Sequence, residues 1–242
     1  MENISGIAFL GLFFGMIGTT LGGVCGTIVN FKSNKFISFI LEFAAGLMTA
    51  VICFDLIPNS LEFISITVLI IGIILGVGSM IYCNNFVNNK FNKENNYKNG
   101  LLKVGMIIGI GLAIHNFPEG LAIGSGFEVS PELGIALAIA ICIHDFPEGV
   151  AMALPMKQGG IGARRVILYT AMSGISTGIG ALVGAIIGGI SKEMIGCSLG
   201  FAAGAMLYIV VCEIIPESNE LYKGRLSKMG NILGIVIGLL VI

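Results

Sequence analysis

Long apolar runs with few charges dominate this chain and restrict it to folds that a membrane can hold. Of its 242 residues, 55% are hydrophobic and only 11% are charged. A helix of about 20 apolar residues spans the hydrocarbon layer of a bilayer, and inside lipid the backbone polar groups must be paired within the protein. The sequence therefore predicts an all-α integral membrane protein, a single domain over residues 1–242 surrounded by a lipid bilayer.

Eight runs are apolar enough to be predicted as transmembrane helices. They cover residues 4–29, 36–58, 62–83, 101–126, 131–155, 165–190, 195–217 and 228–242. The last run is short, so an arrangement of seven spans remains an alternative. The one long polar stretch, residues 84–100, is rich in Asn and Lys and predicts a cytoplasmic loop between the third and fourth spans.

The basic residues indicate how these spans are oriented. Of the 13 Lys and Arg residues, all except Lys192 fall near connections that share one side of the membrane if eight spans are present. The side richer in Lys and Arg is normally cytoplasmic. We therefore expect a multi-pass protein of the cell membrane with both termini outside.

Two parts of the chain repeat at an offset of 158 residues. Ala44–Met48 recurs as Ala202–Met206, and Ile57-Pro58 recurs as Ile215-Pro216. The same offset aligns the first predicted span with the sixth. Because the second copy comes five spans after the first, an odd number, the copies would cross the membrane in opposite directions. The pattern predicts an inverted repeat of spans 1–3 and 6–8 around spans 4 and 5, a 3+2+3 arrangement that suits alternating access.

The two central spans carry near-copies of one hexapeptide, His115–Gly120 and His144–Gly149, which contain the only histidines of the chain. Ionisable residues are costly inside a membrane and tend to be functional. A His and a Glu four positions apart share one helix face, and imidazole with carboxylate is a ligand set for zinc, iron or manganese. We predict a divalent metal site made of His115, Glu119, His144 and Glu148, with purely structural His–Glu pairing as the alternative.

Neighbouring polar residues extend this hypothesis. Asn116 and Asp145 lie three positions before the glutamates and could help to hold a second metal ion bridged by them, or could simply join helices by hydrogen bonds. Outside the hexapeptides, the acidic residues beside prolines near helix ends could relay metal ions or protons along a transport path or be solvated at the interface; they are Asp55, Glu213 and Glu217. Glu42 is expected to cap a helix or to reach the membrane surface.

Together these motifs resemble the ZIP (Zrt/Irt-like) family of divalent metal transporters, and the Ala-Ala-Gly-x-Met segments are similar to its bacterial GufA-like branch. The resemblance implies a primary metal site at the two histidines and two glutamates, and a second site made by Asn116, Asp145 and the same glutamates. GufA-like members usually have Glu-Pro in the sixth span, where this chain has Thr177-Gly178. The second site would therefore lack one carboxylate, so transport through one dominant site is expected.

We therefore expect a carrier that moves Zn²⁺, or a similar ion such as Cd²⁺, Fe²⁺ or Mn²⁺, into the cytoplasm by alternating access. No phosphate-binding GxxxxGK[ST] motif occurs in the sequence, so direct coupling to ATP is not expected. We expect no enzyme activity, no resident cofactor and no nucleic-acid partner. An intramembrane metalloenzyme and a metal-selective channel remain alternatives, and the glycine-rich helix faces leave a homodimer open.

Overall fold

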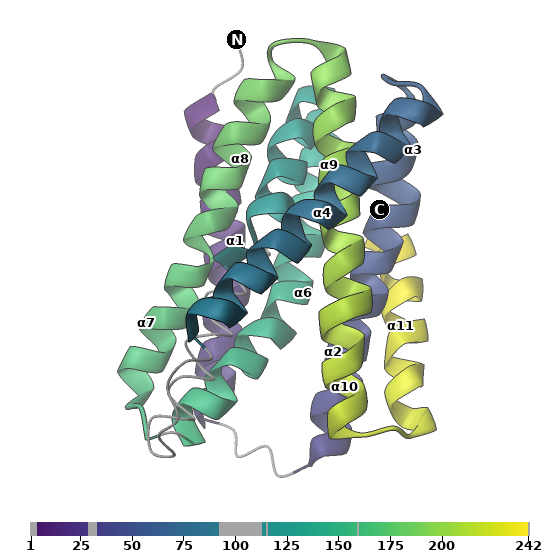
Figure 1. Ribbon diagram of the computed structural model, residues 1–242. Helices are drawn as coiled ribbons and strands as arrows, with labels where there is room; N and C mark the ends of the chain where they lie inside the picture. Colours follow the sequence, from purple (N-terminus) through teal and green to yellow (C-terminus); the bar gives the residue numbers. More distant parts are fainter. Residues whose placement is uncertain (1–3, 29–32, 92–112, 115, 159, 242) are drawn as a thin grey trace.

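The computed structural model describes residues 4–28, 33–91, 113–114, 116–158 and 160–241, and the regular elements in these ranges are helices (Figure 1). Between α4 and α6 a further helical stretch covers 116–129, here named helix 116–129. The remaining elements are α1 (Ile4–Ile28), α2 (Asn34–Ala50), η1 (Val51–Leu56), α3 (Ile57–Leu61), α4 (Ile66–Phe91), α6 (Pro131–Gln158), α7 (Ala163–Ser173), α8 (Ile175–Gly188), α9 (Lys192–Ile209), η2 (Val210–Ile214), α10 (Ile215–Leu221) and α11 (Arg225–Val241).

Within the described residues, six helical stretches are long and apolar enough to cross a membrane. They are Ile4–Ile28, Asn34–Leu61, Ile66–Asn85, Pro131–Leu154, Ala163–Gly188 and Lys192–Leu221. The prediction of an all-helical chain with membrane-spanning helices is confirmed at these six places. Of the other two predicted spans, the last corresponds to α11, which has 17 residues, and residues 101–112 of the fourth lie outside the described part of the chain.

The predicted loop over residues 84–100 begins too early. Helix α4 continues to Phe91, and the first polar residue of the stretch is bound to a neighbouring helix. The amide of Asn84 donates to the Tyr208 hydroxyl at 3.1 Å and to Glu213 Oε1 at 3.2 Å. Polar side chains that find partners on an adjacent helix need not end their own helix. Residues 92–100 are outside the described ranges.

Two helices also pass through prolines that the sequence analysis had placed at their ends. The chain stays helical through Pro58 and Pro216, and a π-helical segment precedes each of them, η1 before Pro58 and η2 before Pro216. A proline has no N–H to donate, and a π-helical turn changes the hydrogen-bond pattern where that donor is missing. At Pro118, Pro147 and Pro155, which also lie within helices, the described backbone is α-helical.

The helices pack as two bundles. In the first bundle α1 packs on α6, α7 and α8; in the second α2 packs on α10 and α11, and α9 packs on α3 and α4. The bundles meet where α2 contacts α6 and where α8 contacts α9. Helix α2 leads to α3 at the top of Figure 1, whereas α9 leads to α10 at the bottom. The two π-containing helices therefore run in opposite directions.

Glycines bring the helices of the first bundle into backbone contact. A Cβ atom at Gly149 of α6 would lie 2.2 Å from the Thr19 carbonyl oxygen of α1, and one at Gly120 would lie 2.0 Å from the Thr177 carbonyl oxygen of α8. Only glycine permits such close approach between membrane helices. Thr19 and Thr177 are 158 residues apart, so the contact of α1 with α6 matches that of α8 with helix 116–129.

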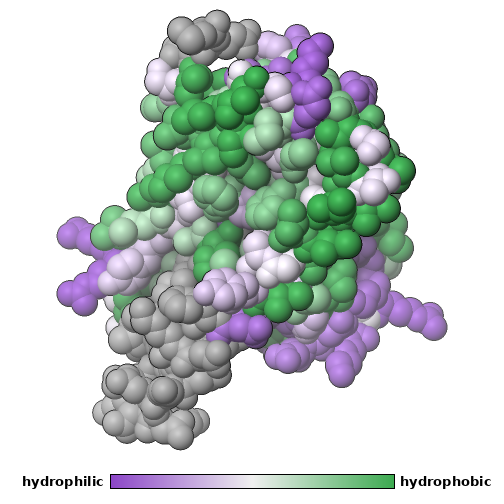
Figure 2. Space-filling view, turned by 45° about the horizontal axis from the view of Figure 1, so that its top comes forward, coloured by the Kyte–Doolittle hydropathy of each residue, from purple (hydrophilic) through white to green (hydrophobic). Residues whose placement is uncertain are grey.

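The outer surface has the polarity expected of a chain in lipid. Large apolar side chains are exposed on α1, α4, α8 and α11, including Phe9, Ile74, Ile186 and Ile232. Figure 2 shows apolar residues over the flank of the molecule, with hydrophilic residues gathered towards its ends. Between the helices, the buried interior combines small residues with a few polar side chains, and these polar residues define the candidate site.

Candidate functional site

Three of the predicted ligands meet between helix 116–129 and α6. Each of Glu119, His144 and Glu148 offers a ligand atom within 4.8 Å of the other two. His144 Nε2 lies 3.0 Å from Glu119 Oε1. His144 and Glu148 lie one helical turn apart on the same face of α6, which is why both reach the same point. We name these three residues the His/Glu cluster.

The His/Glu cluster is removed from solvent. Glu119 and His144 have no exposed surface and Glu148 is 3% exposed. Two carboxylates held this close together in a buried place would repel each other and lose their hydration. A divalent cation would offset both costs, and carboxylate oxygen with imidazole nitrogen is a donor set that Zn²⁺ accepts. The geometry of this cluster therefore suits a bound metal ion better than a structural hydrogen bond.

His115 lies outside the described residues, so the prediction that both histidines face the same ion stays a prediction. Its repeat partner His144 is in the cluster, and the residue after each histidine is buried nearby. Asn116 and Asp145 have no exposed surface. Asp145 Oδ1 lies 3.7 Å from His144 Nε2, which places this carboxylate at the edge of the cluster.

Several oxygen atoms around the cluster have no hydrogen-bond partner in the part of the chain that the structure describes. They are Asn116 Oδ1, Glu119 Oε2, both carboxylate oxygens of Asp145, and Thr177 Oγ1. Buried polar atoms are nearly always paired with protein or water. Asn116 also donates through Nδ2 to the Ser173 carbonyl oxygen at 3.2 Å, so its amide joins helix 116–129 to the end of α7 while its oxygen remains available.

Thr177 stands on α8 at the position where the expected second metal site lacks a carboxylate. It is fully buried and faces α1, because a Cβ at Gly15 would lie 2.5 Å from Thr177 Cβ. One turn further along α1, a Cβ at Gly18 would lie 2.6 Å from Asp145 Cβ. The threonine and the aspartate therefore contact successive turns of the same helix.

The three path residues lie outside the His/Glu cluster. Asp55 is buried in η1, and its Oδ2 atom has no hydrogen-bond partner in the described ranges. Glu213 is half-buried in η2 and accepts a hydrogen bond from Asn84, whereas Glu217 is exposed on α10. Asp55 and Glu213 are related by the offset of 158 residues, so each π-helical segment carries one acidic residue.

One buried acidic residue was misjudged from the sequence. Glu42 was expected to cap a helix or reach the membrane surface, but it is 1% exposed. It pairs with Lys228 of α11 and accepts a hydrogen bond from Ser218 of α10. The available signal was an acid in the middle of one predicted span and a lone base at the start of another, Glu42 in 36–58 and Lys228 in 228–242.

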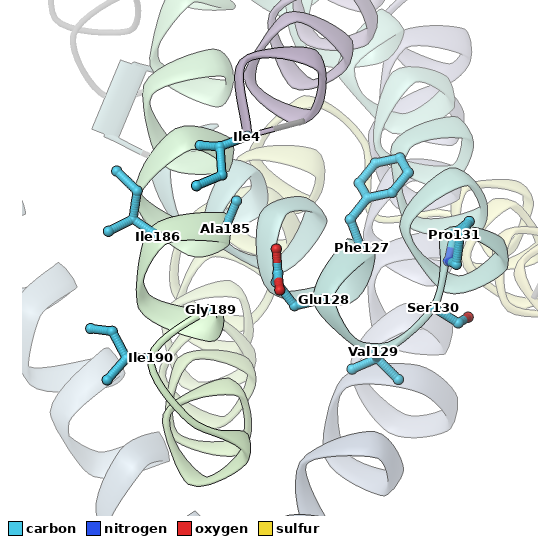
Figure 3. Close-up of a pocket in the computed structure, with 10 residues that line it drawn as sticks. All are labelled: Ile4, Phe127, Glu128, Val129, Ser130, Pro131, Ala185, Ile186, Gly189 and Ile190. Atoms are coloured by element: carbon cyan, nitrogen blue, oxygen red, sulfur yellow. The ribbon is translucent and has the colours of Figure 1, made fainter. Parts of the chain in front are cut away.

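A separate pocket of about 560 Å³ lies where α1 begins and α8 ends (Figure 3). Glu128 is the one charged side chain among the residues that line it. Tight contacts at Gly180 and Gly184 join α8 to helix 116–129, and none of the predicted metal ligands borders the pocket. The pocket is therefore distinct from the His/Glu cluster.

Comparison with known proteins finds relatives of this chain. A family model described as ZIP zinc transporter matches residues 88–242. The zinc transporter ZupT of Chlorobium limicola is 32% identical over 97% of this chain and 96% of its own length. The zinc transporter GufA of Myxococcus xanthus is 37% identical over 54% of this chain, and human zinc transporter ZIP11 is 36% identical over 56%. These last two matches span 52% of GufA and 41% of ZIP11.

Proposed function

Given that this chain belongs to the ZIP zinc transporter family, a family of membrane transporters and not of enzymes, we propose that it carries Zn²⁺ or a similar divalent ion into the cytoplasm. The observation that carries the proposal is the buried meeting of Glu119, His144 and Glu148 between two helices. An ion held there would be surrounded by protein within the membrane, at a place that neither aqueous side reaches freely. Cd²⁺, Fe²⁺ and Mn²⁺ accept similar donors and are the alternative substrates.

The two-bundle architecture supports alternating access as the mechanism. The first bundle holds the ion, and the second bundle contributes the π-helical segments with Asp55 and Glu213 on either side. Movement of one bundle against the other at the α2–α6 and α8–α9 contacts would expose the His/Glu cluster first to one side and then to the other. In this scheme the ion passes Asp55 on its way in and Glu213 and Glu217 on its way out.

For this mechanism we propose an architecture of eight transmembrane helices in a 3+2+3 arrangement. Support comes from the matching glycine contacts of α1 and α8 and from the matching π-helical segments of α2–α3 and α9–α10. The basic residues at the α10–α11 connection would face the cytoplasm, with both termini outside. Located in the cell membrane, the protein would then release its ion beside Glu213.

We expect one ion in the site during transport. Asn116 and Asp145 offer oxygens beside the cluster, but Thr177 supplies a hydroxyl where GufA-like relatives are expected to supply a carboxylate. A second divalent ion close to the first requires additional negative ligands to offset the repulsion between the two ions. His115 would complete the coordination of the single ion.

Uptake of Zn²⁺ into proteoliposomes tests the proposal. We expect saturable uptake by the wild-type protein and loss of uptake when His115, Glu119, His144 and Glu148 are all changed to Ala. The matched control is Glu128→Gln, which removes an acidic side chain from the separate pocket and should transport like wild type. Equal flux in the wild-type and fourfold variants would overturn the proposed site, and discrete conductance steps in place of saturable flux would identify a channel.

A further inference from the structure

The end of the second bundle that bears the basic connections contains a buried polar network. Ser38, Ser218 and Ser227, from α2, α10 and α11, have no exposed surface. Ser38 Oγ lies 2.8 Å from Ser218 Oγ, and Ser218 Oγ lies 3.2 Å from Ser227 Oγ. Glu42 accepts from Ser218 at 3.3 Å and pairs with Lys228. We name these five residues the serine–Glu42 network.

The network joins three helices at one point. Ser38 Oγ also lies 2.9 Å from the Ser218 carbonyl oxygen and 3.1 Å from the Tyr222 carbonyl oxygen, so α2 binds the end of α10 and the turn after it. The Lys35 ammonium lies 5.3 Å from the centre of the Tyr222 ring, a distance at which cation and ring attract. The last turn of α10 is therefore fixed to the first turns of α2.

The second bundle has two halves related by the offset of 158 residues, one of α2, α10 and α11 and the other of α9, α3 and α4. The half with α9 shows which contacts the fold itself needs. At the position related by the offset of 158 residues, Ser60 of α3 donates to the Gly196 carbonyl oxygen of α9 at 2.8 Å. Ser218 makes the same contact with the Ser38 carbonyl oxygen at 3.2 Å. The counterparts of the remaining network residues have no polar side chain; they are Gly196, Gly200, Leu69 and Ile70. One serine contact is common to both halves, and the charged pair is an addition to one of them.

A buried carboxylate is costly to keep, so this addition needs a reason. Its partner Lys228 is 48% exposed, so the ammonium keeps contact with water, whereas the carboxylate has lost its hydration and depends on Lys228 and Ser218 for its bonds. Packing alone does not require it, because the opposite half closes with glycine and leucine. Each end lies next to an acid of a π-helical segment, Asp55 or Glu213, and the network is built at the end of Glu213, the acid that Asn84 also binds. Ser218 lies five residues after Glu213, with α10 beginning between them.

We propose that the serine–Glu42 network is a positioning device that fixes η2 and, through it, the Glu213 side chain beside the path by which the ion leaves. Ser218 holds α10 from one side, and Asn84 of α4 holds Glu213 itself from the other. Glu42 and Lys228 are not among the residues of the His/Glu cluster, so we expect them to affect the release of the ion and not its binding. This inference rests on the proposed function as a transporter.

Zinc uptake by proteoliposomes bearing variants of the ion pair tests this proposal. The double variant Glu42→Gln/Lys228→Met removes both charges together and so leaves no unpaired buried carboxylate. We expect its maximal uptake rate to fall at least about threefold, while the equilibrium affinity of the purified protein for Zn²⁺ stays within about twofold of wild type. The single variant Lys228→Arg keeps the ion pair and should transport Zn²⁺ at the wild-type rate.

Two further measurements separate positioning from general stability. Hydrogen exchange over residues 210–224 should become faster in the double variant, whereas exchange over residues 51–64 in the opposite half should not change. The same double variant made in a Glu213→Gln background should transport no more slowly than Glu213→Gln alone, because the network would act through that carboxylate.

Failure of the inference and failure of the proposed function give different results. If the wild-type protein transports Zn²⁺ but the double variant transports at the same rate, the positioning role is overturned. It is also overturned if the loss persists in the Glu213→Gln background or if exchange rises equally in both halves. Absence of uptake by the wild-type protein would overturn the proposed function, and the inference with it.

Discussion

Gly22 of α1 and Phe146 of α6 lie so close that a Cβ on the glycine would be 2.1 Å from the phenylalanine carbonyl oxygen. Gly180 of α8 has the same relationship to Phe117 of helix 116–129, at 2.2 Å. The two glycines are 158 residues apart, the offset of the inverted repeat, and the two phenylalanines are 29 apart, the spacing of the hexapeptides. Each contact therefore joins a helix of the 158-residue repeat to a helix that carries a hexapeptide. The helices that carry the His/Glu cluster are thus each held by a glycine of an outer helix.

This contact predicts that Gly22→Ala destabilises the protein. Alanine normally stabilises a helix relative to glycine by about 0.5–1 kcal/mol, but here the added methyl group must push α1 away from α6. We expect a net loss of about 1–3 kcal/mol, seen as a lower midpoint of thermal unfolding in detergent. Gly78→Ala on α4 is the matched control, since a Cβ there meets nothing within 4 Å. Equal midpoints for the two variants would contradict the packing described.

Glu119→Gln tests whether the carboxylate beside His144 binds metal. Glutamine keeps the size of the side chain and can still accept a hydrogen bond, but it gives up the negative charge that attracts the ion. We expect the dissociation constant for Zn²⁺ to rise at least about tenfold, which corresponds to about 1.4 kcal/mol, in competition with a chelating dye. Glu132→Gln, at the exposed start of α6, should bind as wild type does. Unchanged affinity in Glu119→Gln would remove this residue from the site.

Thr177→Glu should change the number of ions bound. The new carboxylate would arise on α8, next to the turn of α1 that contacts Asp145, and would supply the charge that a second ion needs. We expect the zinc stoichiometry measured by titration to rise from one to two ions per chain. Thr177→Gln has the same shape without the charge and should bind one ion. Two ions in the wild-type protein would show that the threonine does not limit the site.

Asn84→Ala should loosen the end of α4. The amide of Asn84 bonds both Tyr208 and Glu213, and each such bond contributes about 1 kcal/mol. Hydrogen exchange over residues 84–91 is expected to accelerate at least about tenfold, while exchange in α1 stays the same. The control is Asn85→Ala, whose side chain is exposed. If both variants exchange alike, the bonds of Asn84 do not hold the helix.

The sequence was most informative where one physical requirement dominates. Apolar length predicted the six described helices that are long and apolar enough to span a membrane, because a bilayer imposes a fixed thickness on a helix. The hexapeptides predicted that Glu119, His144 and Glu148 meet, because few arrangements relieve the cost of several ionisable groups in lipid. The offset of 158 residues aligned α1 with α8, and the glycines of these two helices make matching contacts.

Other features depend on partners distant in the chain and could not be predicted. Nothing near Asn84 indicates that Tyr208 and Glu213 will extend its helix. Glu42 gives no sign of its partner Lys228, which lies 186 residues away. The π-helical segments arise where a proline meets a helix that tertiary packing keeps intact, and local sequence alone favours ending the helix there.

X-ray absorption at the zinc edge of the zinc-loaded protein tests the central claim most directly. The chain has six cysteines, all free in this structure, and sulfur ligands to zinc lie at about 2.3 Å, whereas nitrogen and oxygen ligands lie at about 2.0–2.2 Å. If the His/Glu cluster holds the ion, the zinc has a shell of nitrogen and oxygen only. The outer-shell scattering of imidazole is then present and weakens when His144 is changed to Ala. A sulfur shell, or a spectrum unaltered by that substitution, would contradict the claim.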